Sequence, residues 1–405
     1  MRTSENTAGH VRIPLPPGLP DRVDPTLGQG EVVSALGAIA QSLWAGAEIL
    51  SGGLMAVPEF EAKLGMGLHL FQVTDALLRV DARLRELGAG RQVLAYARNG
   101  LDGDLTPGRV LETAYGRYLD QAVTAAADLA AGPGGLGDGP TRRMLLLHLP
   151  ELTAARDWGT DAARRYREHG PGQSAQAPES GPGRARKALR DNRFITFSHT
   201  RDYREKEEAP AGEDERYRAD LLEFVRVNRD EIDAIETFAL VYFDLMGEVP
   251  LPMLHDLAST TWDEVRHALI GQRLLEHMGL DPYAYPCSMI GIEVRSRLGG
   301  WDALAQISLF GELNIIAPMR QLAGRAHRRG EPVVANAFDF ICSDEALHLK
   351  RIRAWLRTHH PLGDLAEIEE HTKRRAGQEL EGLGVLGEEY FVGLTSAQIF
   401  ELLGE

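Results

Sequence analysis

Apolar residues recur at intervals of three and four over long stretches of this chain, and this pattern constrains the fold most strongly. On an α-helix that spacing gathers apolar side chains on one face. No stretch alternates apolar and polar residues for long enough to indicate a sheet. The pattern predicts helices over 32–49, 59–87, 109–131 and 141–167, and again over 214–246, 254–278, 301–329 and 332–357. We therefore expect an all-α protein.

A stretch rich in Gly, Pro, Ser and Gln at 170–183 separates these two sets of helices. Such residues bury too little apolar surface to order themselves, so they indicate a linker. We expect an extended arm over 1–30, a helical bundle over 31–169, a linker over 170–190, a second bundle over 191–360 and a helical tail over 361–405. Four helices with short turns in each half predict two antiparallel bundles.

Charge and cysteine content exclude several classes of protein. The chain has 59 acidic and 44 basic residues and a formal net charge of -15, which argues against nucleic acid and anionic membranes as partners. Two cysteines cannot form a disulfide scaffold or a four-cysteine metal site. No apolar core of a signal peptide and no run of about eighteen apolar residues is present, so we expect a cytoplasmic protein without a membrane span.

Two short motifs contain candidate functional residues. They are Asp263-Glu264-Val265-Arg266-His267 and Asp344-Glu345-Ala346-Leu347-His348. Each places a glutamate and a histidine three residues apart, on one face of a helix. A single such pair arises often by chance. Two pairs, on the second and fourth predicted helices of one bundle, are far more specific.

The first and third helices of that bundle each offer a carboxylate at a matching distance from the turn. Glu312 matches Glu345 in height, and Glu236 matches Glu264, while Glu231 is a weaker candidate. Four carboxylates and two imidazoles inside a bundle are the ligand set of a di-iron or di-manganese centre. The predicted metal-binding and catalytic residues are Glu236, Glu264, His267, Glu312, Glu345 and His348.

Further roles follow from helical phase. We expect Asp263 to orient His348 and Asp344 to orient His267, because a ligating histidine usually donates its other N–H to a carboxylate. Helical phase relative to the ligands also predicts pocket residues, which are Ala239, Phe243, Ile316, Met319 and Cys342.

At these residues the sequence resembles the ferritin-like di-iron carboxylate superfamily, over roughly 213–359. The stretches DAIETFALVYFDLMGEV and TTWDEVRHALIGQRLLEHMG are similar to bacterial two-domain ferritin-like proteins of unassigned activity with a DExRH motif. The resemblance implies that the second bundle is a ferritin-like four-helix bundle with a dimetal centre. FEAKLGMGLHLFQVTDALLRVDARLREL resembles a helix of the amino-terminal bundle less specifically.

The first bundle is expected to lack a metal. The proteins that this helix resembles carry further acidic and histidine residues on it, whereas Thr74, Asp75 and Val80 lie along it here. The acidic and histidine side chains available in this half are Glu61, His69, Glu112, His148 and Glu151. The motif SDEALHLK also resembles ribonucleotide reductase small subunits, but Gly271 stands where that family has a radical tyrosine.

The resemblance implies a non-haem di-iron oxidase or oxygenase that activates O₂ to oxidise a small organic substrate, for example in specialised metabolism. Two iron ions would be the cofactor, with manganese as the alternative, and O₂ the co-substrate. An external electron donor and a homodimer fit this interpretation. The alternatives are a di-manganese catalase, a ferroxidase or oxidative-stress protein, and a non-catalytic ferritin-like interaction protein. The sequence leaves the substrate and the exact reaction open.

Overall fold

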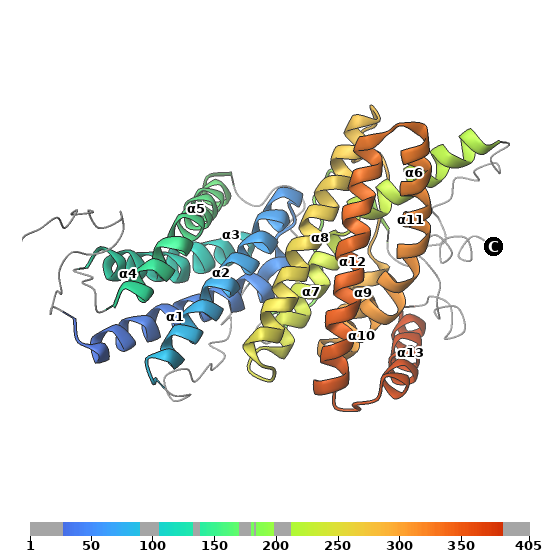
Figure 1. Ribbon diagram of the computed structural model, residues 1–405. Helices are drawn as coiled ribbons and strands as arrows, with labels where there is room; N and C mark the ends of the chain where they lie inside the picture. Colours follow the sequence, from blue (N-terminus) through green and yellow to red (C-terminus); the bar gives the residue numbers. More distant parts are fainter. Residues whose placement is uncertain are drawn as a thin grey trace, which may run out of the picture.

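The computed structural model describes residues 27–89, 105–132, 138–169, 180–181, 184–197 and 212–383. Most of the expected arm, residues 170–179 and 182–183 of the expected linker, and the end of the tail lie outside these residues. Nearly all of the described chain is helical, and the long helices pack antiparallel (Figure 1). The prediction of an all-α protein is confirmed.

The helices of the first half follow the predicted pattern closely. The first pair is α1 (Gln29–Gly53) and α2 (Phe60–Glu86), joined through the short turn η1 (Leu54–Ala56). The third predicted helix consists of α3 (Pro107–Leu111), the π-helical turn η2 (Glu112–Leu119) and α4 (Asp120–Ala131), and the fourth is α5 (Gly139–His169).

Helix α1 is long and largely apolar. With η1 it forms a segment, Gln29–Ala56, that is long and apolar enough to cross a membrane by length and composition alone. Most of this segment is buried inside the structure, where α1 packs against α2, η2 and α4. Core helices of folded domains pass the same test of length and composition.

In the second half, two of the predicted helices are interrupted. Its elements are α6 (Glu213–Arg229), α7 (Ile232–Leu245), α8 (Leu251–His277), α9 (Ile290–Leu298), α10 (Gly300–Gln306), the π-helical turn η4 (Ile307–Gly311), α11 (Glu312–Arg329), α12 (Pro332–His359) and α13 (Leu365–Gly382). The sequence predicts one helix over 214–246, whereas the structure divides it at residues 230–231.

The division between α6 and α7 lies where the chain approaches α8 most closely. A Cβ atom at Gly271 would lie 2.2 Å from the backbone nitrogen of Arg229, so only glycine allows this approach. The fully buried guanidinium of Arg229 donates hydrogen bonds to the carbonyls of Tyr285 (2.9 Å) and Pro286 (3.0 Å). Arg229 thereby fixes the end of α6 against the segment that connects α8 to α9.

Two pairs of very short strands accompany the helices. Strand β1 (Ser180–Gly181) pairs antiparallel with β2 (Arg184–Ala185), and β3 (Thr196–Phe197) pairs parallel with β4 (Cys287–Ser288). The second pair attaches the chain between the two halves to the α8–α9 connection.

The two halves share one continuous apolar core. Helix α2 runs beside α8 and α7 (Figure 1), and a Cβ atom at Gly67 of α2 would lie 2.6 Å from a methyl carbon of Val265 on α8. At the same boundary the hydroxyls of Thr74 and Tyr242 lie 3.0 Å apart. The first half therefore packs directly on the helices that carry the candidate site.

Candidate metal centre

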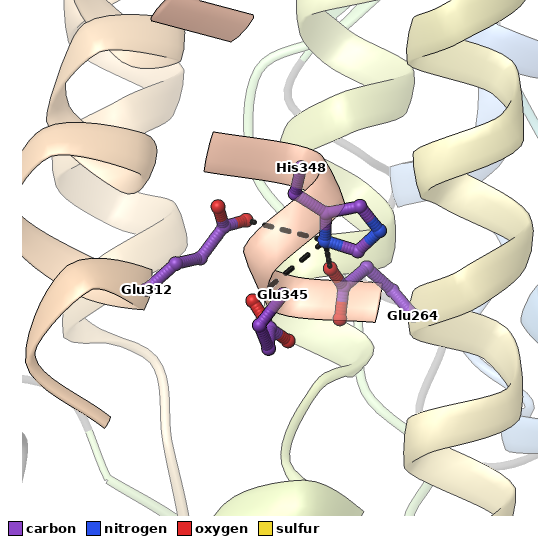
Figure 2. A group of neighbouring side chains, drawn as sticks. All are labelled: Glu264, Glu312, Glu345 and His348. Carbon is purple, nitrogen blue, oxygen red and sulfur yellow. Dashed lines mark ion pairs between the residues drawn. The ribbon is translucent and has the colours of Figure 1, made fainter. Parts of the chain in front are cut away.

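Four of the six predicted ligands converge in the interior of the second half. Glu264 on α8, Glu312 on α11, and Glu345 and His348 on α12 are all buried. One potential ligand atom from each lies within 4.8 Å of the others. Figure 2 shows the three carboxylates directed toward the Nδ1 atom of His348.

The atoms that face one another in this cluster lack hydrogen-bond partners. The Nδ1 atom of His348 lies 3.3 Å from Glu264 Oε1, 3.6 Å from Glu345 Oε2 and 4.0 Å from Glu312 Oε1. None of these four atoms, nor Glu312 Oε2, has a hydrogen-bond partner among the described residues. Buried carboxylate oxygens are costly unless they are paired or bind a cation. The donor set therefore fits a metal ion.

His267 continues the cluster on its other side. Its Nδ1 atom lies 3.1 Å from Glu264 Oε2 and 3.3 Å from Glu345 Oε1. Glu264 and Glu345 therefore each turn one oxygen toward His267 and the other toward His348. The two imidazole rings are 6.1 Å apart between centroids. Glu264 and Glu345 thus lie between the two imidazoles.

Glu231 is the carboxylate of the first predicted helix that approaches this cluster. It lies at the start of α7, and burial together with the charges of Glu264 and Glu345 raises its pKa well above the usual value. The charge of His267 acts on the same pKa in the opposite direction, so Glu231 lies within electrostatic reach of both carboxylates and this histidine. Glu231 is the weaker of the two carboxylates that the sequence offers on this helix.

Glu236 does not join the cluster, although it is fully buried as expected. Its Oε1 atom accepts hydrogen bonds from Lys63 (2.6 Å) and Arg190 (2.5 Å), which are also buried. Five helical residues correspond to a rotation of about 140°, so α7 presents Glu231 and Glu236 to different neighbours. Matching heights along the helices does not reveal this difference in phase. The buried Lys63 within an apolar stretch is the sequence signal that Glu236 has another partner.

The two aspartates of the motifs contact the histidines in the crossed arrangement expected from the sequence. Asp263 Oδ2 lies 3.1 Å from His348 Nε2, and Asp344 Oδ2 lies 3.3 Å from His267 Nε2. Arg266 donates a hydrogen bond to each aspartate and holds both in place. With Nε2 engaged in this way, Nδ1 of each ring faces the shared carboxylates.

Electrostatics at the cluster favour positive charge. Burial lowers the pKa of His267, but the neighbouring Glu264, Asp344 and Glu345 together outweigh burial and raise the net pKa well above the usual value. The pKa of His348 is raised in the same way, chiefly by the hydrogen bond with Asp263. Burial opposes ionisation of Glu345, but its interactions with His267 and His348 bring its pKa down to about 2. Burial and the charge of Glu345 raise the pKa of Glu312. The raised pKa values of His267, His348 and Glu312 favour positive charge at the positions where a metal ion could bind.

The predicted pocket residues are distributed over several helices. Ala239 and Phe243 are buried on α7, Met319 is buried on α11, and Ile316 is half-buried. The Sγ atom of Cys342 lies 3.8 Å from the carbonyl oxygen of Ile316, and burial raises the Cys342 pKa to about 11. The ring centroid of Phe238 lies 6.4 Å from that of His348. The sequence does not predict Phe238 as a pocket residue, because helical phase on this helix is counted from Glu236.

The acidic and histidine residues considered in the first half have separate partners. Glu61 pairs with Arg193, and Glu112 pairs with Arg167. His69 Nδ1 lies 2.8 Å from the hydroxyl of Tyr115. His148 lies 3.8 Å from Asp75, which also pairs with His255 on α8, and Glu151 is exposed on α5.

The structure also explains the glycine at 271. The backbone of α6 occupies the space into which any side chain at this position would extend. A tyrosine four residues after His267 therefore has no room in this fold.

Comparison of the chain with protein-family models, with curated proteins and with solved structures gave no match.

Proposed function

We propose that the second half is a ferritin-like four-helix bundle that holds a dimetal centre and acts as a non-haem di-iron oxidase or oxygenase. The observation that carries the proposal is the pair of carboxylates, Glu264 and Glu345, each of which faces both His267 and His348. Shared carboxylates between two histidines are the arrangement that a pair of hard divalent ions needs.

The ligands fall into two groups. Glu231 and His267 would hold one ion, Glu312 and His348 would hold the other, and Glu264 and Glu345 would bridge them. The four carboxylates balance the charge of two divalent ions, which removes the penalty of burying either set of charges alone. Two iron ions, when bound, supply the electrons that reduce O₂ while a small organic substrate is oxidised.

The remaining residues of the chain prepare the site for this chemistry. Asp263 and Asp344 fix the orientation of the two imidazoles, and Arg266 fixes the aspartates. Phe238 and the surrounding apolar helices exclude bulk water from the reacting groups. An external reductase or small reductant is needed to return the metals to the divalent state between turnovers. Manganese accepts similar ligands and is the alternative metal.

Metal analysis of the full-length protein tests the proposal. We expect about two iron ions per chain after anaerobic loading, and O₂ uptake on exposure to air. Glu264→Gln should lose most of the metal. Glu276→Gln, an exposed position on the same helix, is the matched control and should keep it. A chain that binds no metal under these conditions would overturn the proposal, and a preference for manganese with peroxide disproportionation would indicate a catalase.

A further inference from the structure

A fully buried hydroxyl four residues before Glu312 has no hydrogen-bond partner among the described residues. Ser308 lies in η4, and its Oγ atom makes no hydrogen bond to any described residue. Other buried hydroxyls in these helices donate to the carbonyl four residues earlier, as in Ser51 to Ala47 (2.7 Å), Thr74 to Leu70 (2.7 Å) and Thr261 to Leu257 (2.9 Å). Because η4 is a π-helical turn, its carbonyls are displaced from the α-helical arrangement and this bond is not made.

Ser308 precedes Glu312 by about one helical turn in the same helical run. The two residues therefore lie on nearly the same face of that run. That run packs against α12, the helix of Glu345 and His348. Both carboxylate oxygens of Glu312 are likewise without a hydrogen-bond partner. Two unpartnered polar groups therefore follow one another along the same buried face.

A bound metal ion would pair with the carboxylate of Glu312 but would leave the hydroxyl of Ser308 without a hydrogen-bond partner. Glu231, Glu264, His267, Glu312, Glu345 and His348 already provide the carboxylates and imidazoles that two ions need. The neighbours of Ser308 in η4, Ile307 and Leu309, are buried and apolar. A hydrogen-bonding group in such surroundings is costly when unpaired and strong when paired.

We propose that the Ser308 hydroxyl forms a hydrogen bond with the molecule that is oxidised at the dimetal centre. The substrate is then a small polar molecule with a hydrogen-bonding group, such as an amine, hydroxyl or carboxylate, at the end that enters the site. A plain hydrocarbon chain would leave Ser308 unpaired and is disfavoured. This inference rests on the proposed function.

Azide, a small anion that accepts hydrogen bonds, probes the hydroxyl in the iron-loaded, oxidised full-length protein. Its affinity is measured from the change in visible absorbance for the wild type, Ser308→Ala, Ser308→Thr and Ser51→Ala. We expect Ser308→Ala to weaken azide binding about tenfold with unchanged iron content, since one hydrogen bond to a charged group is lost. Ser308→Thr should retain most of the affinity, and Ser51→Ala should match the wild type. Equal affinity in Ser308→Ala would overturn the inference.

A second measurement does not depend on the metal. In the metal-free protein Ser308→Ala should leave Tm unchanged or raise it, because an unpartnered buried hydroxyl is removed. Ser51→Ala, which breaks a buried hydrogen bond, should lower Tm. A similar decrease in Ser308→Ala would show that the hydroxyl has an internal partner and would refute its role. If iron does not bind at all, the proposed function is wrong. The Tm comparison still tests whether the Ser308 hydroxyl lacks an internal partner.

Discussion

Two glutamates near the start of α7 have different neighbours. Burial and the charges of Glu264 and Glu345 raise the pKa of Glu231, whereas Glu236 lies between Lys63 and Arg190. Glu236 joins cations from outside the second half to α7, because Lys63 belongs to α2 and Arg190 to the segment before α6. Glu236 therefore holds the two halves together, and Glu231 is the glutamate that we propose as a metal ligand.

Glutamine substitutions should separate these roles. Glu231→Gln should reduce the bound metal from about two ions per chain to about one, with little change in stability. Glu236→Gln should keep the metal but lower the free energy of unfolding by about 3 kcal/mol, because Lys63 and Arg190 are left buried without an anion. Metal analysis and urea unfolding of both variants test this. Metal loss in Glu236→Gln alone would restore the assignment made from the sequence.

The aspartates behind the histidines provide a second prediction. Asp263→Asn and Asp344→Asn should each weaken metal binding about 10- to 100-fold, because the ring that each aspartate orients is freed. Competition with a metal chelator measures the affinity. Asp339→Asn, an exposed aspartate of α12 that pairs with His327, should have no effect on it. Unchanged affinity in both site variants would show that the imidazoles are oriented by other contacts.

The pKa values at the centre predict how pH affects the metal-free protein. The pKa values of His267 and His348 are raised, so their contribution to stability is complete below about pH 6.5, the usual histidine value, and is lost as pH rises through the raised values. The raised pKa values of Glu231 and Glu312 act in the same direction. Tm of the metal-free protein should therefore fall between pH 6 and pH 9.

Metal loading should reverse this trend, because ions replace the protons and bind better as the ligands deprotonate. The difference in Tm between the loaded and the metal-free protein should grow from pH 6 to pH 9. A constant difference would mean that the ligands do not exchange protons for metal.

At the scale of helices, the sequence predicts most elements but not their interruptions. The heights of Glu264, Glu312 and Glu345 follow from residue counts, and these side chains meet as expected. The break at residues 230–231 and the π-helical turn at 307–311 leave the apolar spacing almost unchanged, so periodicity does not reveal them. Residue counts give the height of a side chain along a helix but not the face on which it lies. Phe238 is missed because helical phase on α7 is counted from Glu236, which faces Lys63 and Arg190 instead of the cluster.

Gly271 provides a test of the break between α6 and α7. Gly271→Ala should destabilise the protein by about 1–3 kcal/mol, because its Cβ atom would meet the backbone of Arg229. Movement of α6 should also displace Glu231 and weaken binding of one metal ion. Gly324→Ala on α11, where the nearest atom would be a flexible arginine nitrogen at 3.6 Å, is the matched control and should be neutral or stabilising. Equal unfolding curves for the two variants would contradict the close approach.

At the scale of the whole molecule, the two halves form one core rather than two independent units. Helix α2 packs on α8, which carries Glu264 and His267, and the buried pairs of Glu236 cross the same boundary. A site built on α8 therefore depends on the first half for its rigidity.

Unfolding of the full-length, metal-free protein should accordingly occur as a single transition in calorimetry. Gly67→Val at the α2–α8 contact should lower Tm of that whole transition, because added side-chain atoms would collide with Val265. Two transitions, with only one of them shifted, would show that the halves fold separately.

The π-helical turn before Glu312 has a consequence for descent. A π turn can be regarded as one residue inserted into an α-helix. Because the wider turn absorbs this residue, α11 keeps nearly the helical phase of the segment before it. Deleting one residue between 307 and 311 would therefore restore a regular helix and leave Glu312 on almost the same face. It would also return the carbonyl four residues before Ser308 to the α-helical position, where the hydroxyl can bond to it. The extra residue and the free hydroxyl would thus be gained or lost together.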